Sequence, residues 1–231
     1  MPQKNQTTKG KWENGIESEL RFWDNYFRTK GLQWSDYYGM QFDPTLSLQQ
    51  RAAALLPDQV DVYILDVGAG PLTFLGKTLE GKQLHITAVD ALADEYDRIL
   101  EKYKIEPLVR TEKLDAEMLT NRFAANTFDL VFARNCIDHS YDPELSIRQM
   151  VTVVKVGCYL LMEHNPDEAD TRGYSGLHQW NFSMNDVGEF LIRSRQSEVN
   201  VTQKYRDLCT VTCECVTELG ERWLITKFHK K

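Results

Sequence analysis

One short stretch of the sequence combines an acid with two glycines in a way that suits ligand binding. The segment ILDVGAGPLTFLG at residues 64–76 ends an apolar run with an acid and two glycines. Gly68 and Gly70 would let the backbone turn tightly and approach a ligand without a clash from a Cβ atom. A second apolar run ends at Asp90, where a carboxylate can accept hydrogen bonds from a ribose diol. These residues predict a loop that binds a nucleotide-like ligand.

Two details distinguish NAD from S-adenosylmethionine (SAM) as that ligand. The pyrophosphate fingerprint G-x-G-x-x-G requires a third glycine, and Thr73 stands at that position. Asp66, just before Gly68, would repel a pyrophosphate but suits a cationic amino-acid ligand. SAM carries an ammonium and a sulfonium and has no phosphate. The residues therefore favour SAM, and an NAD-dependent oxidoreductase is kept as the alternative.

Further titratable residues follow later apolar runs. His139, in NCIDHSYDP, follows one run, and Glu163 with His164 ends the next. His178 lies in the long loop 165–182, whose length is typical of a functional lid. Histidine titrates near neutrality, so His139, Glu163 or His178 would serve as the base for a hydroxyl acceptor. The alternative for His139 is that it only packs on the cofactor and hydrogen-bonds its own loop.

No metal site is predicted. Asp138, Glu163 and His164 offer suitable ligand atoms, but their spacing matches no metal motif. The three cysteines between residues 209 and 215 alternate onto one face of an expected strand. We expect them to be small apolar residues of a sheet core, because no C-x-x-C pair or flanking histidine supports a metal cluster.

The elements that position these residues are predicted from residue 62 onward. Short apolar strands alternate with stretches that read as helices, including 72–81, 92–103 and 143–154. Strands that are apolar on both faces imply a parallel sheet with helices on both sides, and right-handed crossovers make it doubly wound. In such an α/β sheet, ligands bind beyond the carboxyl ends of the strands, where the acids and glycines lie.

The chain on either side of this pattern is predicted separately. Residues 16–30 and 46–56 read as helices, and residues 183–194 as a further helix. Three strands are then expected at residues 198–205, 208–216 and 222–229, the last two joined by a hairpin at TELGE.

Four motifs in order resemble those of class I SAM-dependent methyltransferases. They are LDVGAGPLTFLG, AVDAL, KLDAEML and FDLVFARNCIDHSYDP, within about residues 60–165. The resemblance, to the small-molecule enzymes of the methyltransferase type 11 kind, implies a Rossmann-like, seven-stranded, mostly parallel sheet and SAM as the cofactor. Pro71 stands in place of the usual third glycine and departs from the family pattern.

The resemblance also implies which residues bind the cofactor. The glycine loop would lie against the amino-acid and ribose portions, and Asp90 would take the ribose hydroxyls. Asp115 would meet the adenine, although Asp115 alone would equally serve as a helix cap. Asn135 would approach the methionine portion through its backbone. The cofactor-binding residues implied are Asp66, Gly68, Ala69, Gly70, Asp90, Ala91, Asp115, Ala116 and Asn135.

The acceptor side is predicted from the family and from aromatic residues. Residues 1–59 would form a helical extension that lies over the cleft as a lid, and residues 60–231 would form the SAM-binding domain. Flat aromatic faces suit rings and the C–H faces of sugars, so we expect the acceptor to be a small molecule or glycan building block. We expect methylation at oxygen rather than at nitrogen or carbon. A non-catalytic SAM-binding subunit is a third hypothesis. The predicted substrate-binding residues are Trp34, Tyr38, His164 and Trp180.

The composition of the chain limits the kinds of partner and the cellular location that we expect. The 231 residues include 27 basic and 34 acidic ones, giving a net charge of −7 with no basic stripe, which disfavours nucleic acid. No apolar run reaches about 18 residues, so no membrane span is expected. The N-terminal stretch MPQKNQTTKGKWENG has no apolar core like that of a signal peptide. With five cysteines in no disulfide-like framework, we expect a cytoplasmic protein. The oligomeric state is left open.

Overall fold

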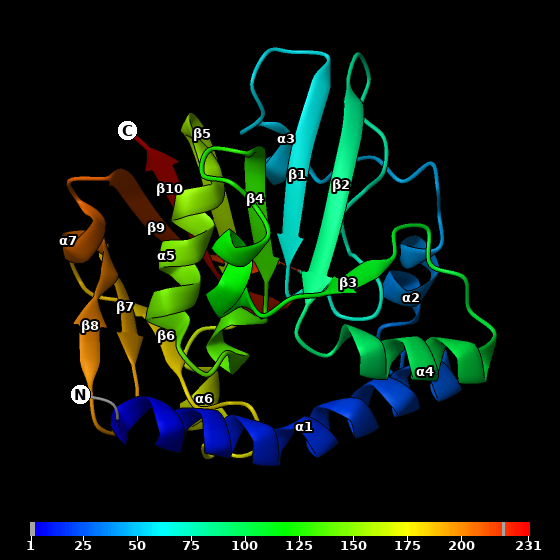
Figure 1. Ribbon diagram of the computed structural model, residues 1–231, viewed down its shortest axis with the longest axis horizontal. Helices are drawn as coiled ribbons and strands as arrows, with labels where there is room; N and C mark the ends of the chain where they lie inside the picture. Colours follow the sequence, from blue (N-terminus) through cyan, green and yellow to red (C-terminus); the bar gives the residue numbers. More distant parts are fainter. Residues whose placement is uncertain (1–2, 219) are drawn as a thin grey trace.

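A seven-stranded sheet forms the centre of the protein in a computed structural model, which describes residues 3–218 and 220–231 and the side chains from Lys9 onward (Figure 1). The strand order is β3-β2-β1-β4-β5-β10-β9. The first five strands in this order are parallel, and β10 runs antiparallel to both of its neighbours. The predicted doubly wound, mostly parallel sheet is confirmed. Its strands are β1 (Asp61–Val67), β2 (Gln83–Asp90), β3 (Thr111–Lys113), β4 (Phe128–Arg134), β5 (Val154–His164), β9 (Cys209–Glu218) and β10 (Glu221–Lys230).

Helices and a second, smaller sheet surround this centre. The second sheet has the order β6-β7-β8 and is antiparallel. Its strands are β6 (Asn181–Met184), β7 (Phe190–Arg193) and β8 (Glu198–Asn200). The α-helices are α1 (Gln3–Thr29), α2 (Ser35–Gln41), α3 (Gln50–Ala53), α4 (Ala93–Tyr103), α5 (Pro143–Val153), α6 (Glu168–Thr171) and α7 (Val201–Tyr205), and the 3-10 helices are η1 (Ala116–Asn121) and η2 (Ile137–His139).

Both faces of the central sheet are buried. Successive residues of a strand point to opposite faces, so Ile64 packs with Ala52 of α3, whereas Leu65 belongs to the cluster that contains Met150 of α5. Each such side chain is fully or almost fully buried, which stabilises the fold by about 1.5–3 kcal/mol per large apolar residue. This two-sided core explains why the strands are apolar throughout and fixes their carboxyl ends at one edge.

The helix expected at residues 72–81 is wrong. This segment instead runs as an irregular loop beside residues 46–49, where Leu48 N donates to Thr78 O at 2.8 Å and Lys77 N donates to Leu46 O at 2.7 Å. Gly76 lies so close to the Ser47 backbone that a Cβ atom there would collide with it. Tertiary pairing therefore satisfies the backbone that a helix would otherwise have satisfied.

The helix expected at residues 183–194 is also wrong, because this segment forms the β6–β7 hairpin. Gly188 has φ +82° and its N–H donates to Asn185 O at 3.0 Å, which makes a tight turn. The strand expected at residues 198–205 is only β8, followed by the short helix α7. The helix expected at residues 46–56 is reduced to α3.

The C-terminal hairpin of β9 and β10 completes the central sheet. Its strands pair antiparallel from Glu218 and Glu221 onward, as predicted, and the centre of the TELGE turn at residue 219 lies outside the described residues. Along β9, Cys209 is buried, Cys213 is half-buried and Cys215 is exposed. The expectation of core cysteines is therefore correct at the inner end of this edge strand and wrong for Cys215.

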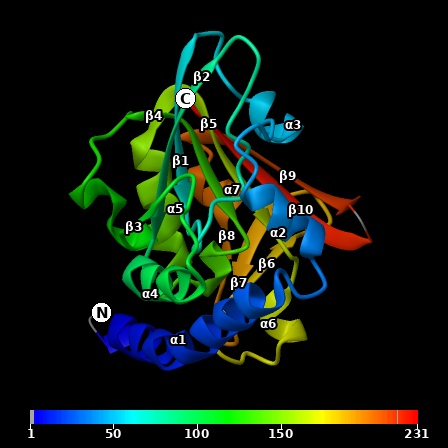
Figure 2. The same ribbon diagram turned by 90° about the vertical axis from the view of Figure 1, so that its right-hand side faces the viewer.

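The long helix α1 crosses the molecule below the sheet edge where the site residues end (Figures 1 and 2). Its residues Trp23, Tyr26 and Phe27 are buried in one aromatic cluster with Tyr96 of α4. The helix thus extends well beyond the predicted residues 16–30 and is anchored at its C-terminal half. Among the described residues, no helix is long and apolar enough to cross a membrane.

Candidate active site

A cavity of about 770 Å³ lies at the carboxyl ends of β1, β2 and β4. Its volume falls in the range of small-molecule and cofactor sites. Its walls come from the glycine loop after β1, from α1 and α2 with the turn between them, and from the loop that follows β5. The cavity therefore lies where the sequence placed the ligand, beyond the carboxyl ends of the strands.

Neither glycine of the glycine loop has room for a side chain. Gly68 has φ +68°, and a Cβ atom there would lie 2.5 Å from Cys136 Sγ. Gly70 has φ +63°, and its Cβ atom would lie 3.0 Å from the Trp23 ring. Gly68 N–H also donates to Val89 O at 2.8 Å, which ties the loop to the end of β2. Both glycines and Ala69 line the cavity, so the exposed backbone faces a ligand.

The Asp90 carboxylate is already oriented by the backbone. Its Oδ2 accepts from Gly70 N–H at 3.0 Å and its Oδ1 accepts from Leu92 N–H at 2.8 Å. Each carboxylate oxygen can accept a further hydrogen bond, and Asp90 and Ala91 both line the cavity. Burial raises the pKa of Asp90 to about 6, with the two backbone donors opposing that shift. A pair of ribose hydroxyls fits this arrangement.

Asp66 lies at the floor of the loop. Its carboxylate accepts from the Thr73 hydroxyl at 2.5 Å, so the residue that replaces the third glycine instead supports the acid. Burial raises the pKa of Asp66 to about 7, despite the Thr73 hydrogen bond and with a further contribution from Asp90. A cationic ligand in this cavity would be stabilised by ionised Asp66 and Asp90, and a phosphate would be repelled.

Of the other predicted cofactor-binding residues, some line the cavity and one lies behind its wall. Asn135 and Ala116 line the cavity. Asn135 has φ +49°, and its backbone N–H donates to Glu163 O at 2.8 Å. Asp115 begins η1 and accepts from the Tyr141 hydroxyl at 3.1 Å, while its neighbours Leu114 and Ala116 reach the wall. Its side chain makes no capping hydrogen bond to η1, so the capping alternative is wrong.

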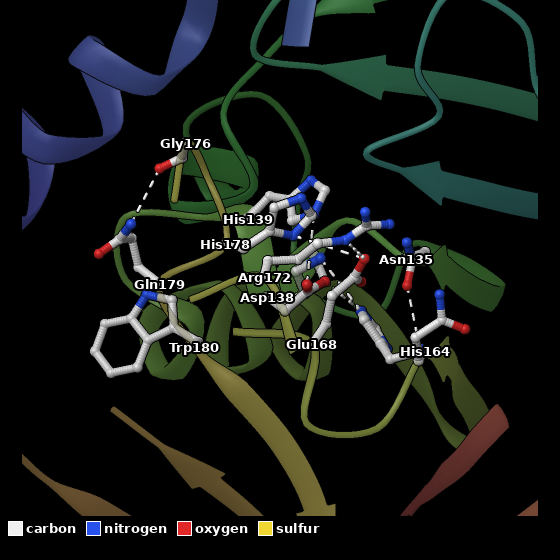
Figure 3. A network of polar contacts seen from close by, with 12 residues as sticks. Asn135, Asp138, His139, His164, Glu168, Arg172, Gly176, His178, Gln179 and Trp180 are labelled. Atoms are coloured by element: carbon white, nitrogen blue, oxygen red, sulfur yellow. Dashed lines mark hydrogen bonds and ion pairs between the residues drawn. The ribbon is translucent and has the colours of Figure 1, made fainter. Parts of the chain in front are cut away.

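Four titratable side chains point toward one another where η2 and the loop after β5 meet, three of them on a second wall of the cavity (Figure 3). His139 Nε2 and His178 Nδ1 are 3.0 Å apart, and His139 Nε2 is 3.4 Å from Asp138 Oδ2. Glu168 Oε1 is 3.8 Å from His178 Nδ1. We call Asp138, His139, Glu168 and His178 the polar cluster. Sequence reasoning named both histidines but missed Glu168, because nothing in the sequence fixes the path of loop 165–182.

Burial governs the charge of this cluster. It raises the pKa of Asp138 above the ordinary range of an aspartate. Burial alone would lower the pKa of His139, but the carboxylates of Asp138, Glu19 and Glu168 outweigh it and raise that pKa. Burial and the neighbouring His139 lower the pKa of His178 to about 3. Of these two neighbouring imidazoles, His139 thus favours the protonated form and His178 the neutral form.

Glu163 and His164 lie behind the cavity wall. Both oxygens of Glu163 are held by arginines, with Arg51 Nη1 at 2.6 Å and Arg134 Nη1 at 2.8 Å. His164 is buried, and its Nε2 accepts from Ile137 N–H at 3.2 Å. The structure therefore does not bring Glu163 together with His139 and His178, and it places the predicted substrate contact His164 away from the wall. Glu163 instead orients Arg134, which lines the cavity.

Aromatic side chains, several of them from the N-terminal segment, form a part of the cavity wall that we call the aromatic end. The predicted Trp34 is among them. Tyr38 packs behind the wall against Phe42, with ring centroids 4.9 Å apart, and Trp180, half-buried against the core, donates to Ser140 O at 3.1 Å. Neither is on the wall, because each is held by packing. The aromatic residues of this end are Trp12, Phe22, Trp34, Tyr37, Phe74, Tyr141 and Trp223, and Trp23, Tyr26, Tyr96 and Phe132 also line the cavity.

The helix α1 and the loop after β5, which both contribute to the walls of the cavity, touch each other at Gly15. A Cβ atom on Gly15 would lie 2.6 Å from Leu177 Cδ2 and 2.8 Å from the Gly176 backbone. The absence of a side chain at Gly15 thus allows these two segments to touch. Lys9 also lies over the Tyr141 ring, 5.0 Å from its centroid.

Comparison with protein families agrees with this site. The family model described as a methyltransferase domain matches residues 65–162, from the end of β1 to the end of β5. That span holds the glycine loop, Asp90, Asn135 and His139. The comparison with curated proteins finds no matching sequence.

Solved structures show the same fold at low sequence identity. A chain in the complex between the Haloferax volcanii Trm112 methyltransferase activator and the putative methyltransferase aligns with a TM-score of 0.58 and 12% identity, covering 92% of this chain and 96% of that one. A SAM-dependent methyltransferase from Aquifex aeolicus gives a TM-score of 0.50 and 15% identity, over 92% and 97%. A putative S-adenosylmethionine-dependent methyltransferase from Listeria monocytogenes gives a TM-score of 0.50 and 13% identity, over 78% and 96%.

The cavity fits the cofactor of that family and not a dinucleotide. No helix follows the glycine loop within the described residues 71–82, so a pyrophosphate would find no helix N-terminus there. The alternative of an NAD-dependent oxidoreductase is therefore wrong. The bare backbone of the loop, the two acids and the free lone pairs of Asp90 suit a ribose and a cationic amino acid. Residues 65–162 thus match a methyltransferase domain, the chain shares its fold with SAM-dependent methyltransferases, and S-adenosylmethionine is the cofactor that this domain implies.

Proposed function

We propose that this protein methylates an oxygen atom of a cytoplasmic small molecule or glycan building block. The observation that carries the proposal is that the glycine loop, the two histidines of the polar cluster and the aromatic end line one cavity. S-adenosylmethionine supplies a methyl group on a sulfonium, from which in-line displacement releases a neutral leaving group. Proximity and alignment within the cavity would therefore provide much of the acceleration.

The residues of the chain have distinct tasks in this proposal. Asp90 binds the ribose hydroxyls, and the Asp66 carboxylate supports the cationic amino-acid portion of the cofactor. Trp34 and the other aromatic residues of that end hold the acceptor by its flat faces and exclude water. His139 and His178 are the polar groups that an acceptor hydroxyl would meet between the two ends. We further propose that residues 1–59, through α1, act as the lid over the cleft.

Arg134 and Trp223 mark a second polar end of the cavity. The Arg134 guanidinium lies 4.2 Å from the centroid of the Trp223 ring and is oriented by Glu163. Both residues line the cavity, so an acceptor that carries a carboxylate or a phosphate would find a partner there. This supports an acceptor with an aromatic or sugar ring and an acidic group.

The test is turnover with labelled SAM and a panel of phenols, sugars and sugar nucleotides, with primary amines as the matched comparison. We expect an O-methyl product, identified by its carbon chemical shift, and loss of turnover in Trp34→Ala with SAM binding kept. Methylation of nitrogen or carbon would contradict the proposal. SAM binding without turnover on any acceptor would instead support the non-catalytic subunit.

A further inference from the structure

The polar cluster has a feature that hydrogen bonding within the protein does not explain. Asp138 is 1% exposed and Glu168 is 5% exposed. Both oxygens of Asp138 and the Oε2 of Glu168 are buried and accept no hydrogen bond from any described residue. Burying a carboxylate oxygen without a hydrogen-bond partner is strongly unfavourable, and more so when the group is charged. Such groups require either a proton or a cation.

We propose that the polar cluster binds one divalent transition-metal ion through Asp138, His139, Glu168 and His178. One ligand atom from each of these residues lies within 4.8 Å of all the others. Three of the separations are 3.0, 3.4 and 3.8 Å. Two ligands bound to one ion at about 2.1 Å are about 3.0 Å apart at a right angle and about 3.4 Å apart in a tetrahedron. The cluster thus needs only a small contraction to close on an ion.

The choice of ligand atoms is fixed by the surroundings. His164 Nε2 is 3.7 Å from Asp138 Oδ1, but its lone pair already accepts the Ile137 N–H, so His164 is not a ligand. Arg172 Nε lies 3.5 Å from Glu168 Oε1, at the limit of a hydrogen bond, and its side chain is 58% exposed. The cation nearest to Glu168 therefore leaves Oε2 unpartnered and does not replace a metal.

The donor set selects the class of ion. Two imidazole nitrogens with two carboxylate oxygens suit Mn²⁺, Fe²⁺, Co²⁺, Ni²⁺ or Zn²⁺, whereas Ca²⁺ and Mg²⁺ prefer oxygen ligands alone. His139, Glu168 and His178 line the cavity while Asp138 lies behind them. A fifth ligand would therefore approach from the cavity, where an acceptor hydroxyl or water would bind the ion. The site stands whichever acceptor is methylated, because its residues come together without one.

The experiment is a titration of the chelator-treated full chain with Co²⁺, followed by visible d–d absorption and by calorimetry. We expect one ion per chain, and Zn²⁺ and Mn²⁺ competing for the same site. Asp138→Asn and His178→Gln should each weaken binding by about 100-fold. His85→Gln is the matched control, because His85 is a histidine beside an aspartate on the surface, with Nε2 at 2.9 Å from Asp61. That variant should bind as the parent does.

The result separates the metal site from the proposed function. Binding weaker than about 100 µM, or binding that His178→Gln and Asp138→Asn leave unchanged, would overturn the site and indicate an adventitious ion only. If Asp138→Asn fails to fold, His178→Gln alone carries the test, because His178 lies in the loop and is partly exposed. Bound Co²⁺ without O-methylation would leave the metal site standing and refute only the proposed function.

Discussion

The two walls of the cavity satisfy their carboxylates in opposite ways. On the cofactor wall, Asp90 accepts two backbone N–H groups and Asp66 accepts a hydroxyl. On the second wall, Asp138 accepts none from any described residue and Glu168 keeps one oxygen unpartnered. The cofactor wall is thus preorganised by the chain itself, whereas the second wall is complete only with a proton or a cation. Binding at the first wall should therefore depend on geometry, and at the second on which cation is present.

The largest effect is expected at Gly68, where the cofactor wall is packed most tightly. Gly68→Ala would put a methyl group against Cys136 at a positive φ, which should cost about 3–5 kcal/mol of unfolding free energy. Gly81→Ala is the matched control. Gly81 has a similar φ of +73°, but no described atom lies within 4 Å of its Cβ position, so its cost should be about 1–2 kcal/mol.

Urea denaturation of the two variants measures the difference between them. A difference near zero would mean that the contact with Cys136 relaxes freely and that the cofactor wall is not rigid.

The next largest effect concerns which wall binds SAM. Asp90→Ala removes two acceptors of the ribose hydroxyls and should weaken SAM binding by about 10- to 150-fold, equivalent to about 1.5–3 kcal/mol. Asp138→Asn should change it by less than about threefold, because Asp138 lies behind His139 and His178 and does not line the cavity. Calorimetry with SAM distinguishes them, and Asp94→Asn, on the surface of α4 beside Lys113, is the control. Equal losses of SAM affinity in Asp90→Ala and Asp138→Asn would contradict the assignment of SAM binding to the first wall.

The third effect is a pH dependence of SAM affinity. Burial raises the pKa of Asp66 to about 7 and that of Asp90 to about 6. A cationic ligand favours the ionised acids, so binding must release protons at low pH. Affinity should rise about tenfold from pH 5.5 to 7.5, and Asp66→Asn should flatten this rise. A pH-independent Kd in the parent protein would show that these acids stay ionised without the ligand.

The smallest effect is expected at Glu117. In its hydrogen bonding this carboxylate is intermediate between Asp90 and Asp138, because it accepts from one backbone donor, Asp142 N–H at 3.1 Å. Burial raises its pKa from 4.5 to about 7. Between these values the folded state binds more protons than the unfolded state, so stability falls as pH rises through that window. The free energy of unfolding should fall by about 1 kcal/mol per pH unit, and Glu117→Gln should remove this contribution of Glu117.

Denaturant midpoints at pH 5, 6 and 7 measure this slope. An unchanged slope in Glu117→Gln would assign the pH dependence to other groups.

The sequence was sufficient where function depends on local spacing. The glycine loop, Asp90 and Asn135 follow strands whose apolar runs are visible in the sequence, and all line the cavity. The conformation of residues 72–81 could not be predicted from their own sequence, because pairing with residues 46–49 overrides their helical pattern. The polar cluster depends on where α6 and β6 direct the loop that carries Glu168 and His178. Which residues faced the cavity, Trp34 but not Tyr38, likewise depended on tertiary packing.

The contact between Gly15 and Gly176 has a kinetic consequence. If α1 is the lid proposed above, a ligand would leave when the seam between α1 and the loop after β5 parts, and its residence time would be set by that opening. The anchored aromatic half of α1 would stay in place while the half that contains Gly15 lifts. A side chain at Gly15 would hold the seam ajar. Product would then escape faster, even though no group that contacts the reacting atoms has changed.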